Sequence, residues 1–250
     1  GGGNPLTSKV AIIGPSPVTG ADISYTFGQV SIEESKVDYK PTCGNMAAAV
    51  GLFAVEEGYV TIKEPITTVK IYNTNINKII EVNIPVKNSQ IEYKGDFSID
   101  GVPGTASRIT VNYLDSGGSI TGKLFPTGKV RDSVRIEDGR IFEVSVIDCA
   151  NLIIFVSADQ LGISGTEIGE QFNQRPLLDT LEAIRVELGL TMGLFKDKKG
   201  VTPSSHALPK IAVVAQPQSY MTSTNTLIHE RDIDLVGRYV AMGRLHQAFA

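Results

Sequence analysis

The fold of this protein is decided by one stretch of its sequence, Pro41-Thr42-Cys43-Gly44-Asn45-Met46-Ala47-Ala48-Ala49-Val50-Gly51-Leu52-Phe53-Ala54-Val55-Glu56-Glu57-Gly58. The side chains from Met46 to Val55 are all apolar, and a helix with no polar face must be enclosed on all sides. The run is too short to span a bilayer, which needs about 20 apolar residues. We therefore predict a central helix over about 43–57, wrapped by a sheet and ended by Gly58.

The start of this helix carries the first candidate site, Cys43-Gly44-Asn45. The first N–H groups of a helix lack partners inside the helix, and they lie at the positive end of its dipole. A carboxylate binds well there, and the same field favours the thiolate form of a cysteine. Cysteine is also among the most buried residue types, so position alone leaves a packing role open for Cys43.

Composition limits the class of protein. The 250 residues are 42% hydrophobic, which is enough for one large globular domain or two ordinary ones. The net charge of −4 and the lack of a basic run argue against a nucleic-acid partner or an anionic membrane surface. The sequence shows no signal peptide, no membrane span and no Cys/His cluster with zinc spacing. We expect a cytoplasmic protein without a metal site.

Short apolar or alternating runs separated by turn residues predict many strands. They lie at residues 10–13, 23–32, 67–72, 78–86, 90–93, 107–114, 133–136, 140–147, 152–156 and 210–215. With one buried helix, this pattern predicts an α+β fold whose mostly antiparallel sheet curls around the helix. Gly1 to Gly3 precede a strand and not a helix, which excludes a nucleotide-binding loop. Lys9 stands at the mouth of that strand, where a lysine held close to a core loses its charge readily and can act as a base.

The second half contains two predicted helices and a second cysteine. Pro176 begins an outer helix with one apolar face, which Gly189 ends. Asp232 is expected to cap another helix that carries Ile233, Val236, Tyr239 and Val240 on one face. Cys149 falls in the turn at residues 148–151, and we assign it a structural role.

A polar loop at residues 115–123 and a late histidine are weaker candidates. The glycines of the loop allow close approach of a ligand, and its hydroxyl groups can donate to a carboxylate, although a flexible crossover between domains explains the loop equally well. His246 is undecided between a packing and a catalytic role. Both chain ends fall within structural patterns, and we expect the sequence to be a fragment of a longer protein.

The chain contains, in this order, the motifs Asn4-Pro5-Leu6-Thr7-Ser8-Lys9, Tyr25-Thr26-Phe27-Gly28, Cys43-Gly44-Asn45-Met46, Thr121-Gly122-Lys123-Leu124-Phe125-Pro126-Thr127-Gly128 and Met242-Gly243-Arg244-Leu245-His246. This ordered set resembles the PrpF family, which includes 2-methylaconitate cis-trans isomerase, methylitaconate Δ-isomerase and 4-oxalomesaconate tautomerase. The likeness covers essentially the whole chain. It implies the diaminopimelate-epimerase-like fold, in which two similar lobes hold the site in the cleft between them.

The resemblance also implies where the chain divides. Residues 1–126 would form a first lobe without its N-terminal strands. Residues 127–250 would form a second lobe without its central helix and C-terminal part, because family members begin earlier and continue into a Gly-Thr-Gly-Ala stretch that opens that helix.

The resemblance implies the following site. Lys9 and Cys43 match the proposed acid/base pair of the family, with their roles interchangeable. The residues implied around the substrate are Ser8, Gly44, Asn45, Met46, Ser119, Thr121 and His246. The implied reaction is a cofactor-independent isomerisation of an unsaturated di- or tricarboxylic acid, and the oligomeric state, a homo-oligomer included, is left open.

Two other functions stay open at this point. An amino-acid racemase or epimerase of the same fold would need two essential thiols. A carboxylate-binding protein without catalysis would use the cleft only to hold its ligand.

Overall fold

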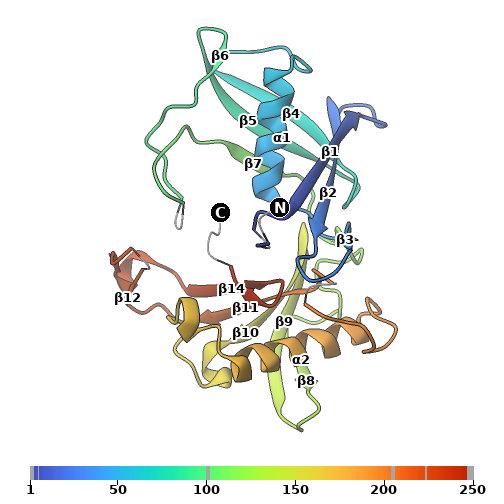
Figure 1. The fold of residues 1–250 in the computed structure, drawn as a ribbon, viewed down its shortest axis with the longest axis vertical. Helices are drawn as coiled ribbons and strands as arrows, with labels where there is room; N and C mark the ends of the chain where they lie inside the picture. The colour runs from blue at the N-terminus through green and yellow to red at the C-terminus, as the bar shows by residue number, and fades with distance from the viewer. Residues whose placement is uncertain (1–2, 5, 100–101, 204–205, 223, 247–250) are drawn as a thin grey trace.

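The computed structural model describes residues 3–4, 6–99, 102–203, 206–222 and 224–246. Within these residues the chain forms two large curled sheets, one above the other in Figure 1, and each has its own hydrophobic cluster. Most strand pairs are antiparallel, and two helices of several turns pack on the sheets. The predicted α+β class is therefore confirmed. The predicted boundary between residues 126 and 127 stays a prediction.

The upper sheet packs against the buried face of the helix that the sequence predicts at the centre. Its strands follow the order β1-β2-β4-β5, with β3 beside β2 and with β6 and β7 beside β5. The parallel pair β2 and β4 is joined through the helix α1, because parallel neighbours need a crossover connection. The elements are β1 (Lys9–Pro15), β2 (Ile23–Val30), β3 (Val37–Asp38), α1 (Gly44–Glu56), β4 (Ile66–Asn73), β5 (Lys78–Lys87), β6 (Gln90–Ile91) and β7 (Thr110–Tyr113).

The lower sheet follows the order β15-β14-β11-β10-β9-β8 and packs one face on helix α2. Here the parallel pair is β10 and β11, joined through α2. The elements are β8 (Asp132–Arg135), β9 (Ile141–Cys149), β10 (Asn151–Ser157), α2 (Arg175–Thr191), β11 (Lys210–Ala215), β12 (Tyr220–Met221), β13 (Leu227–Ile228), β14 (Val236–Ala241), β15 (Arg244–Leu245) and the 3₁₀ turns Ala158–Leu161, Gly169–Gln171 and Glu230–Asp232. None of the described helices is long and apolar enough to cross a membrane.

Helix α1 is less enclosed than its sequence predicted. The residues of its buried face lie on the upper sheet, and Gly51 lets the backbone approach β5 so closely that a Cβ atom would come within 2.6 Å of Val82. Ala49 and Phe53 are exposed, Phe53 by 39%. The prediction of burial on all sides was therefore wrong for the described residues. Apolar side chains show that a face of the helix can be buried. Whether it is buried depends on how many strands of the sheet pack around the helix.

The second predicted helix exists but does not end where the sequence suggested. Gly189 lies inside α2, which continues to Thr191, so the predicted end was wrong. The aromatic ring of Phe195 lies against Gly189, and a Cβ atom there would come within 2.2 Å of that ring. Gly189 therefore provides space for a neighbouring side chain and does not stop the helix.

The helix predicted after Asp232 is wrong, because Val236 to Ala241 form the strand β14. Val236, Arg238 and Val240 are buried in alternation, which is the period of a strand. This period is not visible in the sequence, because the charged Arg238 occupies one of the buried positions. The structure buries it, and its guanidinium group donates to the carbonyl of Glu167 at 2.8 Å and lies over the Tyr220 ring.

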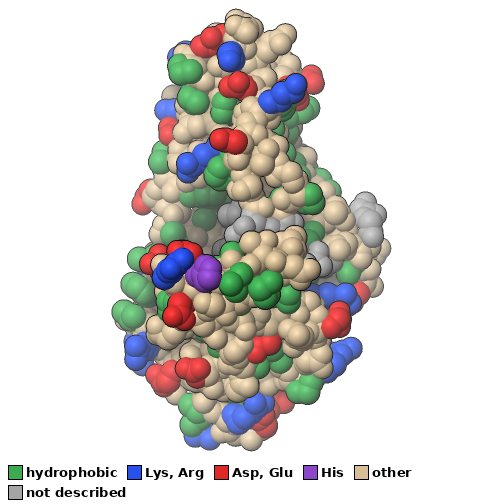
Figure 2. All heavy atoms as spheres, turned by 90° about the vertical axis from the view of Figure 1, so that its left-hand side faces the viewer, with side chains coloured by type: hydrophobic (Ala, Val, Ile, Leu, Met, Phe, Trp, Pro, Cys, Tyr) green, Lys and Arg blue, Asp and Glu red, His purple; other side chains and the backbone are tan. Residues whose placement is uncertain are grey.

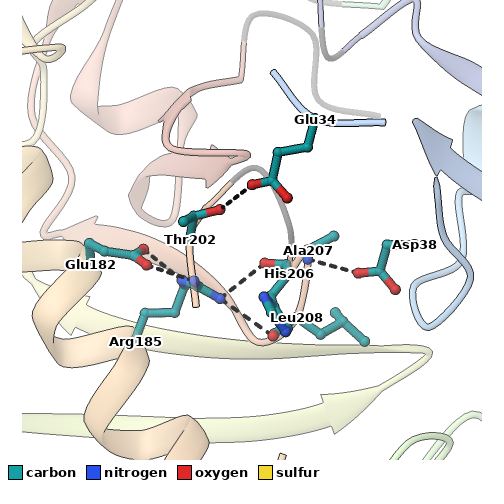
Figure 3. A network of polar contacts seen from close by, with 8 residues as sticks. All are labelled: Glu34, Asp38, Glu182, Arg185, Thr202, His206, Ala207 and Leu208. Carbon is teal, nitrogen blue, oxygen red and sulfur yellow. Dashed lines mark hydrogen bonds and ion pairs between the residues drawn. The ribbon is translucent and has the colours of Figure 1, made fainter. Parts of the chain in front are cut away.

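A polar clasp joins the two sheets (Figure 3). From the upper part, Asp38 accepts a hydrogen bond from the N–H of Ala207 at 2.9 Å, and Glu34 accepts one from Thr202 at 3.3 Å. From α2, Arg185 donates to the carbonyl of His206 at 3.1 Å while Glu182 pairs with its guanidinium group at 2.7 Å. Thr202 and the residues from His206 to Leu208 are thus held from both sides.

We expect acidification to weaken this clasp through His206. Burial, with the nearby cations Lys36, Lys40 and Arg185, lowers the pKa of His206 below its usual 6.5, and Asp38 only partly opposes them. The unfolded chain then binds more protons than the folded one, so stability falls as the pH drops through about 6.5 toward the lowered value.

The measurement compares the loss of Tm between pH 7.5 and pH 5 in the wild type and in His206→Gln. The variant should lose less stability on acidification, and the exposed His229→Gln serves as the matched control. Equal losses in the wild type and in His206→Gln would contradict the prediction.

Candidate active site

The start of helix α1 presents a thiol that is not used for capping. Cys43 precedes the helix in an extended conformation, and its side chain makes no capping hydrogen bond. The N–H groups of Gly44, Asn45 and Met46 have no partners inside the helix, and no acidic residue lies in the first turn. The positive end of α1 is therefore available to an anion.

Lys9 lies next to this thiol. Its Nζ atom donates to Sγ of Cys43 at 3.7 Å, and both side chains are half-buried. The contact follows from the fold, because β1 runs along the edge of the upper sheet and turns Lys9, Ala11 and Ile13 toward the helix side. Two residues that are 34 positions apart thus form a pair that can exchange a proton.

Two buried phenols of the upper sheet lie close to Cys43. The hydroxyl group of Tyr25 donates to the carbonyl of Cys43 at 3.5 Å. Burial raises the pKa of Tyr25, and it raises the pKa of Tyr113 to about 12, even though a hydrogen bond with Thr42 opposes the shift. Both phenols therefore stay neutral at neutral pH, and they place no negative charge beside Cys43.

A cavity of about 420 Å³ opens between the two sheets at this point. Figure 2 shows the molecular surface hollowed between the upper and the lower part. Lys9, Cys43, Gly44 and Asn45 line it from above, and the lower sheet contributes Asn151, Lys210, Tyr239, Arg244 and His246.

The charges on the cavity wall differ from those of the chain as a whole. Three cationic side chains, Lys9, Lys210 and Arg244, line the cavity, whereas Glu170 is the single carboxylate among its described lining residues. The whole chain, in contrast, carries a net charge of −4. Local positive charge of this kind raises the concentration of an anionic ligand.

The structure brings some of the predicted site residues together and leaves others apart. Gly44, Asn45 and His246 line the cavity with Lys9 and Cys43. Ser8 is only 4% exposed and does not line the cavity. Met46 packs on the upper hydrophobic cluster instead.

Ser119 and Thr121 are used inside their own loop. The hydroxyl group of Ser119 donates to the carbonyl of Ser116 at 2.6 Å. The hydroxyl and N–H groups of Thr121 both donate to Asp148, at 2.8 and 2.6 Å. Neither residue lines the cavity. The loop is therefore fastened to the end of β9, so the structure does not support a flexible crossover here.

On the lower wall, sequence reasoning found His246 but missed Lys210 and Tyr239. Lys210 and Tyr239 belong to strands whose apolar residues dominate the pattern, so nothing in their order marks a site. Cys149, assigned a structural role, is exposed at the end of β9 and lines the same cavity. Among the described residues, no cluster of His, Cys, Asp or Glu is placed to hold a metal ion.

The chain is similar in sequence and in fold to known proteins. The sequence model of the family described as PrpF protein matches residues 1–250. The 3-methylitaconate isomerase of Eubacterium barkeri is 42% identical over 251 residues, which are 100% of this chain and 66% of that protein. The 2-methyl-aconitate isomerase of Shewanella oneidensis is 34% identical over 256 residues, which are 99% of this chain and 64% of that protein.

A solved crystal structure of methylitaconate-delta-isomerase superposes with a TM-score of 0.82 at 42% identity, covering 99% of this chain and 64% of the other. The similarity thus extends from the sequence to the arrangement of the strands. The chain spans about two thirds of the length of these relatives.

Proposed function

The chain belongs to the PrpF family, and on that premise we propose that the protein is an isomerase of unsaturated di- or tricarboxylic acids. It moves a double bond, or changes the geometry of one, by removing a proton and returning it. The single observation that carries this proposal is the contact between Lys9 and Cys43 at 3.7 Å, beside the open N-terminus of α1 and inside a cationic cavity.

The reaction requires a base, an acid and a receptor for charge. One member of the Lys9–Cys43 pair removes a proton from the carbon next to the conjugated system, and the electron pair left behind delocalises into a dienolate. The other member returns a proton at the far end of that system. Proton exchange along the Lys9–Cys43 hydrogen bond then restores both groups. No net oxidation or reduction occurs, and the double bond has moved.

The N–H groups of Gly44 and Asn45 supply the receptor. They point out of the first turn of α1, where a substrate carboxylate gains negative charge as the dienolate forms. Preorganised donors of this kind are often the largest single contribution to catalysis. Rotation about a bond that is temporarily single in the dienolate gives cis–trans isomerisation from the same intermediate.

Cys149 supports a second candidate, an amino-acid racemase or epimerase with two thiols, because it shares the cavity with Cys43. Its surroundings argue against that role. It follows a strand and not a helix start, and its Sγ atom lies 3.1 Å from Oγ of Ser116. A racemase predicts that Cys149→Ser is inactive, whereas the proposed isomerase predicts that this variant retains its activity.

The proposed function is tested in D₂O. The chain is incubated with methylitaconate, 2-methylaconitate and oxalomesaconate in turn, and the product is analysed by NMR and mass spectrometry. We expect one of the acids to isomerise and its product to carry deuterium at the carbon that receives the returned proton. An isomerised product without deuterium would contradict proton exchange with solvent through Lys9 and Cys43.

A further inference from the structure

The cavity wall opposite Cys43 carries a lysine that the proton-transfer chemistry does not use. Lys210 is the first residue of β11 and is half-buried. The next residue, Ile211, and Val213 turn into the lower hydrophobic cluster. Alternation along the strand places Lys210 on the other face of the sheet, and that face borders the cavity.

The ammonium group of Lys210 contacts an aromatic side chain. Its Nζ atom lies 5.3 Å from the centre of the Tyr239 ring, which is within the range of a cation–π contact. The Tyr239 ring in turn meets the ring of His246 edge to face at 5.6 Å. In the part of the chain that the structure describes, no carboxylate forms an ion pair with Lys210. The ammonium group thus keeps donors for a ligand.

The two walls therefore offer separate anion receptors. The upper receptor is the start of α1, whose N–H groups suit one carboxylate. A second carboxylate of the same molecule needs another donor, because like charges at one helix end repel each other. The lower wall supplies a cation held in place within the same cavity of about 420 Å³.

We infer that Lys210 binds a second carboxylate of the substrate, while the start of α1 binds the first. The inference rests on the proposed function and adds a prediction of which acids the cavity binds. Acids whose two carboxylates reach both walls are bound, and monocarboxylates of the same skeleton are disfavoured. Lys210 also fixes the orientation of the substrate, since the carbon that loses its proton must lie beside Lys9 and Cys43.

The test uses two acids that differ only in the second carboxylate. Itaconate has it, and methacrylate replaces its carboxymethyl arm with a methyl group. Binding of both to the wild type, Lys210→Met and Lys210→Arg is measured by titration calorimetry. Methionine keeps the length of the side chain and removes the charge. We expect Lys210→Met to weaken itaconate binding by about 10- to 100-fold, as expected for a lost charge-assisted hydrogen bond, and to leave methacrylate binding unchanged.

Two further variants locate the effect. Arg244→Met removes the exposed cation that lines the same cavity, and Lys94→Met removes an exposed lysine that does not line it. Neither should abolish the preference for itaconate, and Lys210→Arg should retain part of it. A circular dichroism spectrum shows whether each variant is folded.

The outcomes separate the inference from the function on which it rests. If the wild type binds both acids equally, or if only Arg244→Met loses the preference, the role of Lys210 is overturned while the carboxylate cavity stands. An equal loss of both acids in Lys210→Met also overturns it. If the wild type binds neither acid, the Lys210 subsite is overturned, whereas the proposed function is decided separately by the isomerisation of the three acids in D₂O.

Discussion

Replacing Cys43 with serine is expected to lower kcat/KM by about 10²–10⁴-fold, which is the usual contribution of a positioned acid or base. Serine keeps the size of the side chain but is a far weaker acid than a thiol, so the proton shared with Lys9 over 3.7 Å no longer moves. Lys9→Met should cause a loss of similar size, because each group restores the protonation state of the other.

The double variant Lys9→Met/Cys43→Ser distinguishes a coupled pair from two independent residues. When two groups act as one unit, replacing either of them removes the contribution of both. The kcat/KM of the double variant should therefore be only slightly lower than that of either single variant. The matched control is Cys149→Ser, which removes the other thiol of the cavity and should retain activity. Fully multiplicative losses in the double variant would contradict the proton exchange between Lys9 and Cys43.

Replacing Asp148 with alanine is expected to cost about 3 kcal/mol of the free energy of unfolding, because it leaves three half-buried donors without their buried, charged acceptor. Asp148 has no exposed surface, and its Oδ2 atom accepts from the N–H of Ile120, the N–H of Thr121 and the hydroxyl group of Thr121 at 2.6–2.9 Å. Urea denaturation followed by circular dichroism measures the loss.

Two further substitutions serve as comparisons for Asp148→Ala. Asp148→Asn keeps the shape and one acceptor oxygen, so it should lose clearly less stability than Asp148→Ala. Asp138→Ala removes an exposed aspartate that pairs with Arg140 at the surface, and its effect should be far smaller. If Asp148→Ala is as stable as Asp138→Ala, the loop at residues 115–123 does not depend on Asp148.

Local patterns predicted most of the elements. Residues 43–57 were predicted as a helix, and α1 spans Gly44–Glu56. The alternating run at 78–86 corresponds to β5, whose residues are buried every second position. Such predictions succeed because a helix or strand with one buried face imposes a fixed period on its apolar residues. The period failed for β14, where the buried Arg238 stands at a position that a sequence pattern counts as polar.

The candidate site was predicted mainly on its upper wall, with His246 as the predicted residue on the lower wall. Cys43, Gly44 and Asn45 are consecutive at a helix start, so their chemistry is visible in the sequence itself. Lys9 was pointed out by its place at the mouth of a strand, and the family motif added its pairing with Cys43. Ser119 and Thr121 looked equally suitable in the polar loop, but the structure uses their hydroxyl groups within the loop and on Asp148.

The sequence by itself determined the apolar helix, the thiol at its start, the strands around it and the family, because each of these depends on residues that are close in the chain or on ordered motifs. Only the tertiary structure decided that Lys9 lies 3.7 Å from Cys43 and that Lys210 and Tyr239 form the opposite wall. The physical reason is that a contact between distant residues depends on the register of strands and on how two sheets face each other, and neither leaves a periodic mark on the sequence.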